Sequence, residues 1–234
     1  MAVTPAKTGE VRDFVAAPTP TLRLLHVHVS TLNPFPAVPP HHHPTEGMTV
    51  VRQGSVRYVS DGKIFDANAG DFFFMTADAV HTPYNVTSQP VVYYAIEIGT
   101  EATPAKPGPS AETWAGPGRL HTGNFPRDGH RPRPTPFGTE TLLVSSPTAT
   151  LMKLECLVMT VNPGMGTGER REPEDELLFL GSGTLEVGIK GVAFRPSAGS
   201  VCFKASKDPY EVKNYGTLPG SFHLVRFTTA STPR

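Results

Sequence analysis

The sequence predicts an all-β chain made of two copies of one antiparallel barrel or sandwich. Residues Phe14–Gly99 align without a gap onto Leu143–Thr228, so that TPTLRLLHVHVSTLNP (19–34) falls on TATLMKLECLVMTVNP (148–163) at an offset of 129 residues. A register this long indicates a repeated domain. Short runs rich in Val, Phe, Tyr and Leu alternate with Asn-Pro, Asp-Gly and Ala-Gly dipeptides, which is typical of strands and turns. The 25 prolines and 22 glycines leave few windows for a helix.

Each copy supplies its own series of predicted strands, all short, apolar and bounded by turn residues. In the first copy they are Leu22–Leu32, Met48–Arg52, Ser55–Val59, Gly70–Met75 and Val91–Ile98. In the second copy they are Leu151–Val161, Leu177–Leu180, Thr184–Ile189 and Ser221–Phe227. The stretch between the copies is rich in proline and has little periodicity, so we expect an irregular connector there. The predicted organisation is a barrel at 14–99, a connector at 100–142 and a barrel at 143–228.

Charge and composition limit the classes of function. The 21 basic and 21 acidic residues give a formal net charge of zero without a like-charge block, which argues against a nucleic-acid surface. We expect a cytoplasmic protein that binds no membrane, because no signal-peptide core and no membrane-length apolar segment is found. Cys156 and Cys202 lie in apolar runs, as core residues do, and form no disulfide framework. A small-molecule substrate is the expected partner, and a homodimer is compatible with the paired copies.

Three histidines of the first copy are the candidate metal ligands. Side chains two residues apart in a strand share a face, so His41 and His43 point one way and His42 the other. His81 follows a turn after the Phe72–Phe74 run, and a neighbouring antiparallel strand can bring it to the same point. Three imidazoles on one side of a cation leave the opposite side open for water or substrate. The pattern therefore predicts a metal site with an open face.

The other histidines give a weaker signal. His26 and His28 alternate with Leu25, Val27 and Val29, which indicates one face of an amphipathic strand. One of the two can line the cavity, but a role other than metal ligation is favoured. The remaining histidines, which follow no partner pattern, are His121, His130 and His223.

The second copy has lost these ligands. The 129-residue offset places Arg170, Glu172 and Tyr210 at the positions of the three histidines, while Glu176 corresponds to Gly47. We expect no metal in this copy, and an ion pair among Arg170, Glu172 and Glu176 that fills the vacated cavity. A metal-free acid/base pair of two inward carboxylates is the alternative, since close carboxylates raise one pKa.

Two stretches, PPHHHPTEGMTVVRQG (39–54) and NAGDFFFMTADAVHTPYN (68–85), resemble the two motifs of the cupin superfamily. The first motif of that family is His-x-His followed by a glutamate and a glycine, and the second contains a glycine, a Pro-x-Gly turn, a histidine and an asparagine. The residues that match are His41, His43, Gly54, Gly70, His81 and Asn85. The repeat makes the chain similar to a bicupin. This resemblance implies two tandem double-stranded jelly-roll barrels, with a divalent metal inside the first.

The chain departs from the family pattern at the glutamate ligand. Counting back from Gly54 puts that ligand at Gly47 and not at the adjacent Glu46, and one residue along a strand turns a side chain to the other face. Glu46 would reach the metal only through a bulge. Thr76 also replaces the proline of the second motif. The resemblance implies a three-histidine site; the candidate pocket residues around it are Glu46, Gly47, Val51, Phe72, Phe74, Asn85 and Tyr94.

Three functions fit such a site. The first is an Fe(II) dioxygenase-like oxidoreductase acting on a small molecule, because a three-histidine site without a carboxylate resembles the cupin dioxygenases that lack the glutamate. The second is a redox-neutral lyase or isomerase, in which the metal polarises a carbonyl and a base moves a proton. The third is a non-catalytic bicupin that binds a small ligand. We expect one divalent metal per chain, Fe in first place, with Mn, Ni, Zn or Cu as alternatives.

Overall fold

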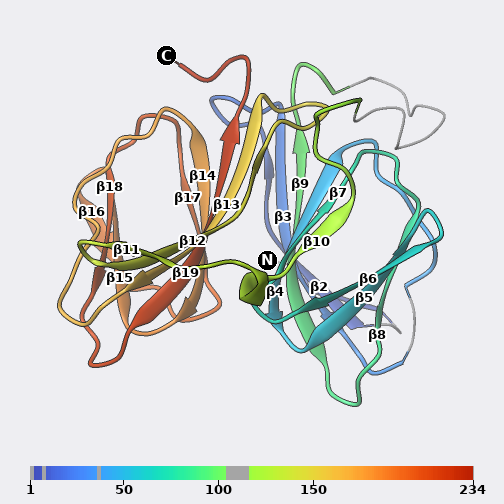
Figure 1. Cartoon of the computed structure of the whole chain (residues 1–234), viewed down its shortest axis with the longest axis horizontal. Coiled ribbons are helices and arrows are strands. Elements are labelled where there is room, and N and C mark those ends of the chain that lie inside the picture. Colours follow the sequence, from blue (N-terminus) through green and yellow to red (C-terminus); the bar gives the residue numbers. More distant parts are fainter. Residues whose placement is uncertain (1–2, 7–8, 36–37, 104–115, 234) are drawn as a thin grey trace. The chain divides into compact units, whose positions relative to one another are not determined.

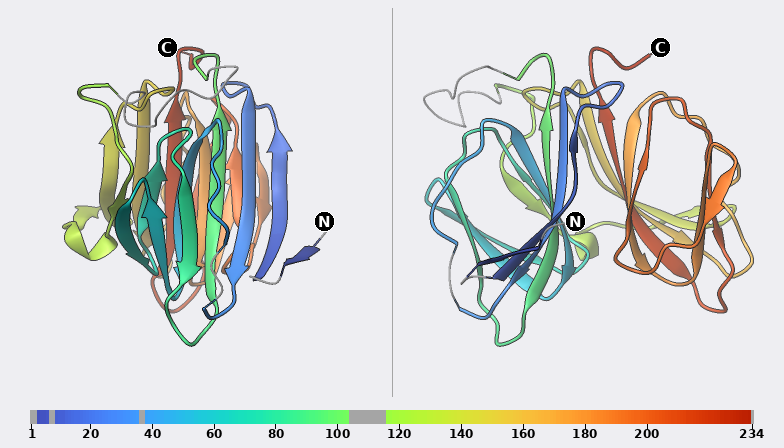
Figure 2. Two further views of the ribbon diagram at one scale, coloured as in Figure 1. Left: turned by 90° about the vertical axis from the view of Figure 1, so that its right-hand side faces the viewer. Right: turned by 180° about the vertical axis from the view of Figure 1, so that it is seen from behind.

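A computed structural model describes residues 3–6, 9–35, 38–103 and 116–233, and the chain in it is built from β-strands. Within these ranges the one helical element is η1 (Arg127–Gly129). The chain divides into two compact units, one of residues 1–126 and 146–151, the other of residues 127–145 and 152–234. Figure 1 shows antiparallel strands curling around the interior of each unit, and Figure 2 shows the same units from two other sides. The predicted all-β class with two cupin-like barrels is confirmed.

The first unit contains a large sheet and a small one. Its strands are β1 (Val3–Ala6), β2 (Gly9–Ala17), β3 (Leu24–Leu32), β4 (Glu46–Gln53), β5 (Ser55–Ser60), β6 (Lys63–Asn68), β7 (Phe72–Met75), β8 (His81–Asn85), β9 (Val91–Gly99) and β10 (Gly123–Phe125). The large sheet has the order β1-β2-β3-β9-β4-β7-β10, and the small sheet has the order β6-β5-β8. Antiparallel sheets that close in this way bury the inward side of each strand.

The second unit repeats this plan. Its strands are β11 (Arg133–Thr135), β12 (Gly138–Ser146), β13 (Lys153–Val161), β14 (Asp175–Ser182), β15 (Leu185–Ile189), β16 (Val192–Phe194), β17 (Val201–Lys204), β18 (Tyr210–Asn214) and β19 (Gly220–Thr228). The sheets have the orders β11-β12-β13-β19-β14-β17 and β16-β15-β18. The central run β3-β9-β4-β7 of the first unit therefore corresponds to β13-β19-β14-β17.

The 129-residue offset holds at the level of single hydrogen bonds. The side chain of Asn85 donates to the carbonyl oxygens of Leu32 at 3.2 Å and Gln89 at 2.6 Å. That of Asn214 donates to the equivalent carbonyls of the second unit, those of Val161 and Leu218, both at 2.8 Å. An asparagine thus closes the same turn in each copy. Asn85, a candidate pocket residue, is not among the residues described as lining the cavity. The repeat also reaches further back than predicted, because β2 and β12 are counterparts.

The segment between the copies is more ordered than its composition suggests. Its described part contains β10, which pairs with β7 through Asn124 opposite Phe73, and then η1, β11 and the start of β12. Strand β10 supplies hydrogen bonds to an edge of the large sheet that would otherwise be open. The predicted connector at 100–142 is therefore irregular only in part; residues 104–115 of it lie outside the described residues.

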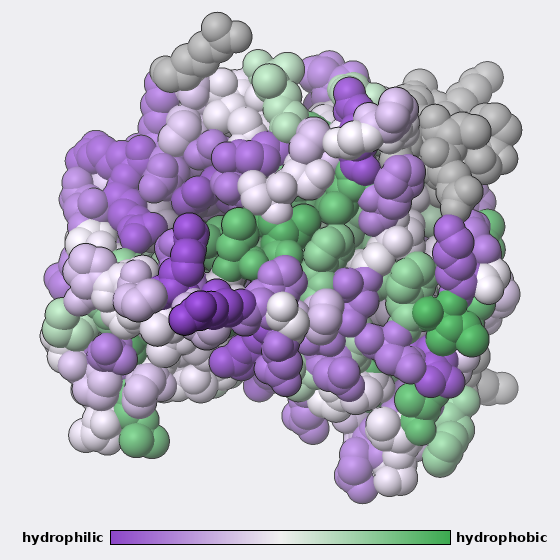
Figure 3. Space-filling model, in the orientation of Figure 1, coloured by the Kyte–Doolittle hydropathy of each residue, from purple (hydrophilic) through white to green (hydrophobic). Residues whose placement is uncertain are grey.

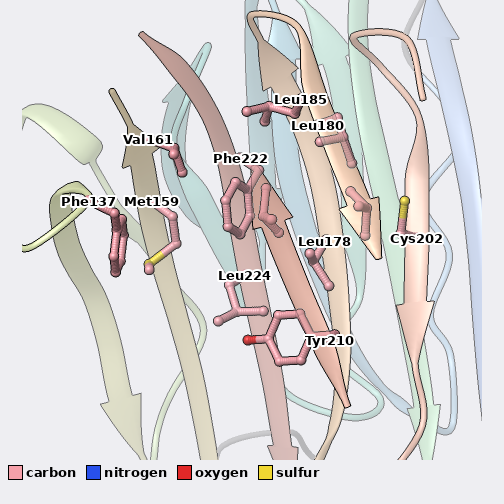
Figure 4. Close-up of a cluster of buried hydrophobic side chains, with 12 residues drawn as sticks. Phe137, Met159, Val161, Leu178, Leu180, Leu185, Cys202, Tyr210, Phe222 and Leu224 are labelled. Atoms are coloured by element: carbon pink, nitrogen blue, oxygen red, sulfur yellow. The ribbon is translucent and has the colours of Figure 1, made fainter. Parts of the chain in front are cut away.

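The interior of each barrel is filled by inward-pointing apolar side chains. In the first unit the Tyr58 ring stacks on Phe73 with ring centroids 4.2 Å apart, and its hydroxyl lies 2.9 Å from that of Thr49. Burial of stacked aromatic rings is among the larger packing contributions. In the second unit the cluster around Phe222, Leu224 and Leu178 occupies the corresponding space (Figure 4).

Polar residues form most of the face drawn in Figure 3. Cys156 and Cys202 are both buried and free, as predicted for core residues. Among the described residues, no helix is long and apolar enough to cross a membrane.

Candidate metal centre

The three predicted histidines come together in the wall of one cavity of the first barrel. The ligand nitrogens of His41, His43 and His81 all lie within 4.8 Å of one another. Main-chain hydrogen bonds of 3.1 and 2.8 Å in an isolated bridge between His41 and His81 hold the start of β8 against the segment before β4. The His42 side chain is half exposed, and its Nδ1 lies 3.3 Å from the carboxylate of Asp78. The alternation expected for this run is therefore observed.

Hydrogen bonding selects the nitrogen that each ring offers. Nδ1 of His41 lies 2.8 Å from the Pro39 carbonyl oxygen, and Nδ1 of His81 lies 2.9 Å from the Ala79 carbonyl oxygen. A carbonyl oxygen can only accept, so each Nδ1 carries the proton and each Nε2 keeps its lone pair. Nδ1 of His43 faces a carboxylate oxygen of Glu97 at 3.7 Å. Orientation of a ring by its second nitrogen is the usual support of a metal-binding histidine.

The imidazoles of His43 and His81 are also held in the neutral form that binds metal. Burial lowers the pKa of His81 to about 4; the Ala79 hydrogen bond acts in the opposite direction, and the neighbouring His41 and His43 add to the lowering. Burial likewise lowers the pKa of His43, although Glu97 acts in the opposite direction. Metal binding requires neutral imidazole, so protons compete weakly with a cation here near neutral pH. The donor set therefore fits a divalent metal.

Glu97 lies beside Gly47, the position that lacks the family's glutamate. Gly47 on β4 is the residue that lacks the family's glutamate, and Glu97 on β9 is its direct cross-strand partner. Besides facing His43, the Glu97 carboxylate lies 3.7 Å from Nδ1 of His26 and accepts a hydrogen bond from the Thr45 hydroxyl at 3.4 Å. A carboxylate from the neighbouring strand thus lies behind His43 and beside this centre.

Two cavities that share lining residues open beside the histidines. The inner one has a volume of about 60 Å³ and the outer one about 380 Å³. Both are lined by His28, His41, His43, Pro83, Tyr93 and Glu97. Burial raises the pKa of Tyr93 to about 12, so its hydroxyl stays protonated at neutral pH and can donate a hydrogen bond. Space of this size accommodates a small molecule next to the imidazoles.

Several predicted wall residues lie elsewhere. Phe72 and Phe74 are one residue out of phase with Met75, which lines the inner cavity, and Tyr94 is one residue out of phase with Tyr93. Because successive side chains of a strand point to opposite faces, these three belong to the other side of the large sheet. The apolar runs FFFM and VVYYAI show no alternation, so the sequence could not distinguish the two faces. Val51 does point into the barrel, but in the apolar cluster beyond the described cavity lining.

Glu46 is an internal anchor of the first unit. Its carboxylate accepts hydrogen bonds of 2.6 Å from the hydroxyls of Thr148 and Thr150, and one of 2.9 Å from the amide of Ala149. It is fully buried, and no register shift occurs near it in β4, where the irregularity comes after Val51. The bulge that would turn Glu46 toward the histidines is absent. Burial raises the pKa of Glu46 more than these hydrogen bonds lower it.

In the second unit, two positive side chains surround the carboxylate at the family's glutamate position. Glu176, the counterpart of Gly47, accepts a 2.7 Å hydrogen bond from Arg226 Nε and lies 3.2 Å from Lys204 Nζ. Arg226 and Lys204 are the counterparts of Glu97 and Met75. The predicted partner Arg170 instead lies over the Phe137 ring, 5.4 Å from its centroid, and the Glu172 carboxylate is 3.9 Å from Arg226. The expected ion pair exists, but with different cations.

Larger apolar residues also fill the space in the second unit that corresponds to the inner cavity of the first. Tyr210, at the position of His81, lies within the apolar cluster beside Leu224 (Figure 4). Leu178 and Leu224 take the places of Thr49 and Ala95, which line the inner cavity of the first unit. Among the described residues, the geometric groups that could hold a metal all lie in the first unit.

Comparison with known proteins identifies the first barrel. A model of the cupin domain matches residues 28–97. Residues 28–97 form a cupin domain. They contain the three histidines, both motifs and Glu97. No curated protein sequence matches the chain.

Solved structures extend the likeness of this cupin domain to both barrels. AerE from Microcystis aeruginosa is 16% identical, with 96% of each chain covered and a TM-score of 0.71. The oxalate decarboxylase of Lactobacillus farciminis, in a formate complex, is 17% identical over 97% of this chain and 84% of that one, with a TM-score of 0.74. The Bacillus subtilis oxalate decarboxylase, which has Mn(II) centres, is 17% identical over 97% and 75%, with a TM-score of 0.72. These similarities establish a bicupin-like fold.

Proposed function

We propose that the protein is a metal-dependent enzyme that acts on a small molecule in the first barrel, with Fe(II) as the metal and a dioxygenase-like reaction. The observation that carries this proposal is the triad of His41, His43 and His81, whose nitrogens lie within 4.8 Å of one another beside a cavity of about 380 Å³. Iron held by three neutral imidazoles supplies redox chemistry with open coordination positions.

The residues around the triad have separate roles in this proposal. Gly47 presents no side chain toward the metal position, which leaves room for a substrate with two donor atoms. Met75, Met48 and Pro83 are apolar walls that exclude water from the inner cavity. Tyr93 offers a protonated hydroxyl, and burial raises its pKa further above neutral pH, to about 12. These groups bind and orient the substrate while the histidines hold the metal.

A redox-neutral lyase or isomerase is the second candidate, and Glu97 is the observation that favours it. A carboxylate in the cavity wall, 3.7 Å from Nδ1 of His43, is suited to accept a proton from a substrate whose carbonyl the metal polarises. The structurally similar oxalate decarboxylases, one of them with Mn(II) centres, support chemistry of this kind on small carboxylic acids. A ligand-binding bicupin without turnover is the third candidate.

Metal identity and oxygen dependence separate the three. The protein is purified with its native metal, analysed for elements, stripped and reloaded anaerobically with Fe(II), Mn(II) or Zn(II). Oxygen uptake with Fe(II) and a small chelating substrate supports the dioxygenase. Turnover without oxygen, retained with Mn(II) or Zn(II), would replace it by the lyase or isomerase. Tight binding of a ligand without turnover under all conditions would leave the binding protein.

A further inference from the structure

A second group of metal-type donors lies in the same barrel. Ligand atoms of Asp13, His26 and His28 are all within 4.8 Å of one another. They come from the neighbouring strands β2 and β3, in which Asp13 is the cross-strand partner of His28. The pairing of these strands shifts register between Asp13 and Val15, and such a bulge re-aims side chains. Here it brings the Asp13 carboxylate within 2.9 Å of His26 Nε2.

The second triad has an unsatisfied nitrogen and a donor spacing that suit a cation. His28 Nδ1 is buried and has no hydrogen-bond partner, so a lone pair or a proton on it is unsatisfied. The 2.9 Å between Asp13 Oδ1 and His26 Nε2 matches the spacing of two adjacent ligands on one ion, about 3 Å for bonds near 2.1 Å. A cation that touches all three groups would satisfy His28 and keep Asp13 and His26 at nearly their present separation.

Both triads face one cavity and share Glu97. The outer cavity of about 380 Å³ is lined by His26, His28 and Asp13 as well as by His41 and His43. One Glu97 oxygen lies 3.7 Å from Nδ1 of His26 and 3.7 Å from Nδ1 of His43. Each of these rings therefore turns Nδ1 to the same carboxylate and keeps Nε2 for its own triad. A carboxylate behind a ligating histidine fixes the ring and increases its basicity.

The negative charge of the outer cavity also favours a bound cation. The described lining of the outer cavity includes the carboxylates of Glu10, Asp13 and Glu97 but no lysine or arginine. In the second unit the counterparts of His26 and Glu97 are Glu155 and Arg226, which pair at 3.3 Å. That unit balances its carboxylate with a cationic side chain, whereas the first has no such cation among the described lining residues.

We propose that Asp13, His26 and His28 form a second divalent-cation site, separate from the three-histidine site and joined to it by Glu97. Two ions on one cavity can hold two oxygen atoms of the same substrate. The first site and the proposed function do not depend on this second ion. A failure of one is therefore distinguishable from a failure of the other.

The test is metal stoichiometry, measured on the full chain. Stripped protein is loaded anaerobically with Co(II) or Mn(II), desalted and analysed for metal per chain, and each ion's affinity is measured by competition with a chelator. We expect two ions in the wild type, one in His28→Ala, one in His43→Ala, and two in the control His42→Ala, whose side chain is half exposed. Asp13→Asn, at an exposed side chain, should weaken the second ion more than tenfold and leave the first within twofold.

The shared carboxylate gives a further readout. Glu97→Gln should weaken both ions by about 10- to 100-fold, the usual effect of removing such a partner. A single ion in the wild type that is lost in His43→Ala and kept in His28→Ala and Asp13→Asn would overturn the second site while leaving the first intact. Loss of both ions from either triad variant would also overturn it, because the sites would not be separate. Circular dichroism of each variant identifies any loss of metal that follows from misfolding.

Discussion

Placing a glutamate at position 47 should reveal that this position and Glu97 share one site in the first barrel. Gly47 and Glu97 are direct cross-strand partners, and Cβ atoms in such pairs are about 5 Å apart. At an effective dielectric constant of about 20, two charges at that distance repel by about 3 kcal/mol. The Gly47→Glu variant of the metal-free protein should therefore be destabilised by up to about 3 kcal/mol.

Steric effects are separable from this repulsion. A Cβ at position 47 would meet only the flexible end of Met75, with Cε at 3.1 Å, so a small movement of that side chain makes room. Gly47→Gln is therefore the matched neutral control and should cost much less than Gly47→Glu. In a Glu97→Gln background the cost of Gly47→Glu should fall to that of the control, since the like charge is gone.

The assay is a double-mutant cycle by urea unfolding at pH 8, with and without metal. We expect a coupling of about 2–3 kcal/mol between the two substitutions in the metal-free protein. With metal the effect should reverse, because two carboxylates next to a cation attract it and Gly47→Glu then tightens metal binding while lowering turnover. A coupling below about 0.5 kcal/mol, the range of independent sites, would refute the claim that Glu97 and position 47 share one site.

Further substitutions at the histidine run, at Glu46 and at Glu176 test other parts of the structure. His43→Ala should abolish stoichiometric metal at the three-histidine site while His42→Ala retains it, as measured by metal analysis; equal losses would mean that the strand faces are assigned wrongly. Glu46→Ala should cost about 3 kcal/mol of unfolding free energy without loss of metal, because several buried donors lose their acceptor. Burial raises the pKa of Glu46, so the folded state binds its proton more tightly and stability falls as pH rises above about 4.3; Glu46→Gln should remove that part of the urea-unfolding pH profile. Glu176→Ala should destabilise by about 3–5 kcal/mol with unchanged metal content, since it leaves the buried Lys204 without its carboxylate.

The sequence predicted the two barrels from the repeat, and the histidine site from the alternation of side chains along a strand. The ungapped offset predicted two similar barrels, and the alternation in a strand predicted that His41 and His43 share a face, to which a neighbouring strand can bring His81. The cavity-wall residues could not be chosen in this way. In the run FFFM every residue is apolar, so no alternation distinguishes the inward face from the outward one. The choice between Phe74 and Met75 was fixed only by the register of β7 against β4.

Contacts between residues on different strands could not be predicted from local sequence patterns either. Glu97 follows the motifs by more than ten positions, and its importance lies in its pairing with Gly47, which no local pattern contains. Glu46 accepts hydrogen bonds from Thr148 and Thr150, about a hundred residues away. Because no local pattern shows these partners, the sequence suggested only a metal ligand shifted by one residue. One signal was available: at the 129-residue offset Gly47 and Glu97 correspond to Glu176 and Arg226, two changes that compensate each other.

That compensation explains how one scaffold gives two different interiors. Three positions on adjacent strands β9, β4 and β7 carry Glu97, Gly47 and Met75 in the first barrel, where a single carboxylate faces the imidazoles of His26 and His43. Their counterparts in the second barrel are Arg226, Glu176 and Lys204. A buried carboxylate needs a positive partner, and there two side chains provide it permanently. In the first barrel no described lysine or arginine pairs with Glu97, which faces His26 and His43 instead, so a bound cation would supply the positive charge that the chain provides in the second barrel. The same geometry thus favours a self-sufficient ion pair in one barrel and a bound metal in the other.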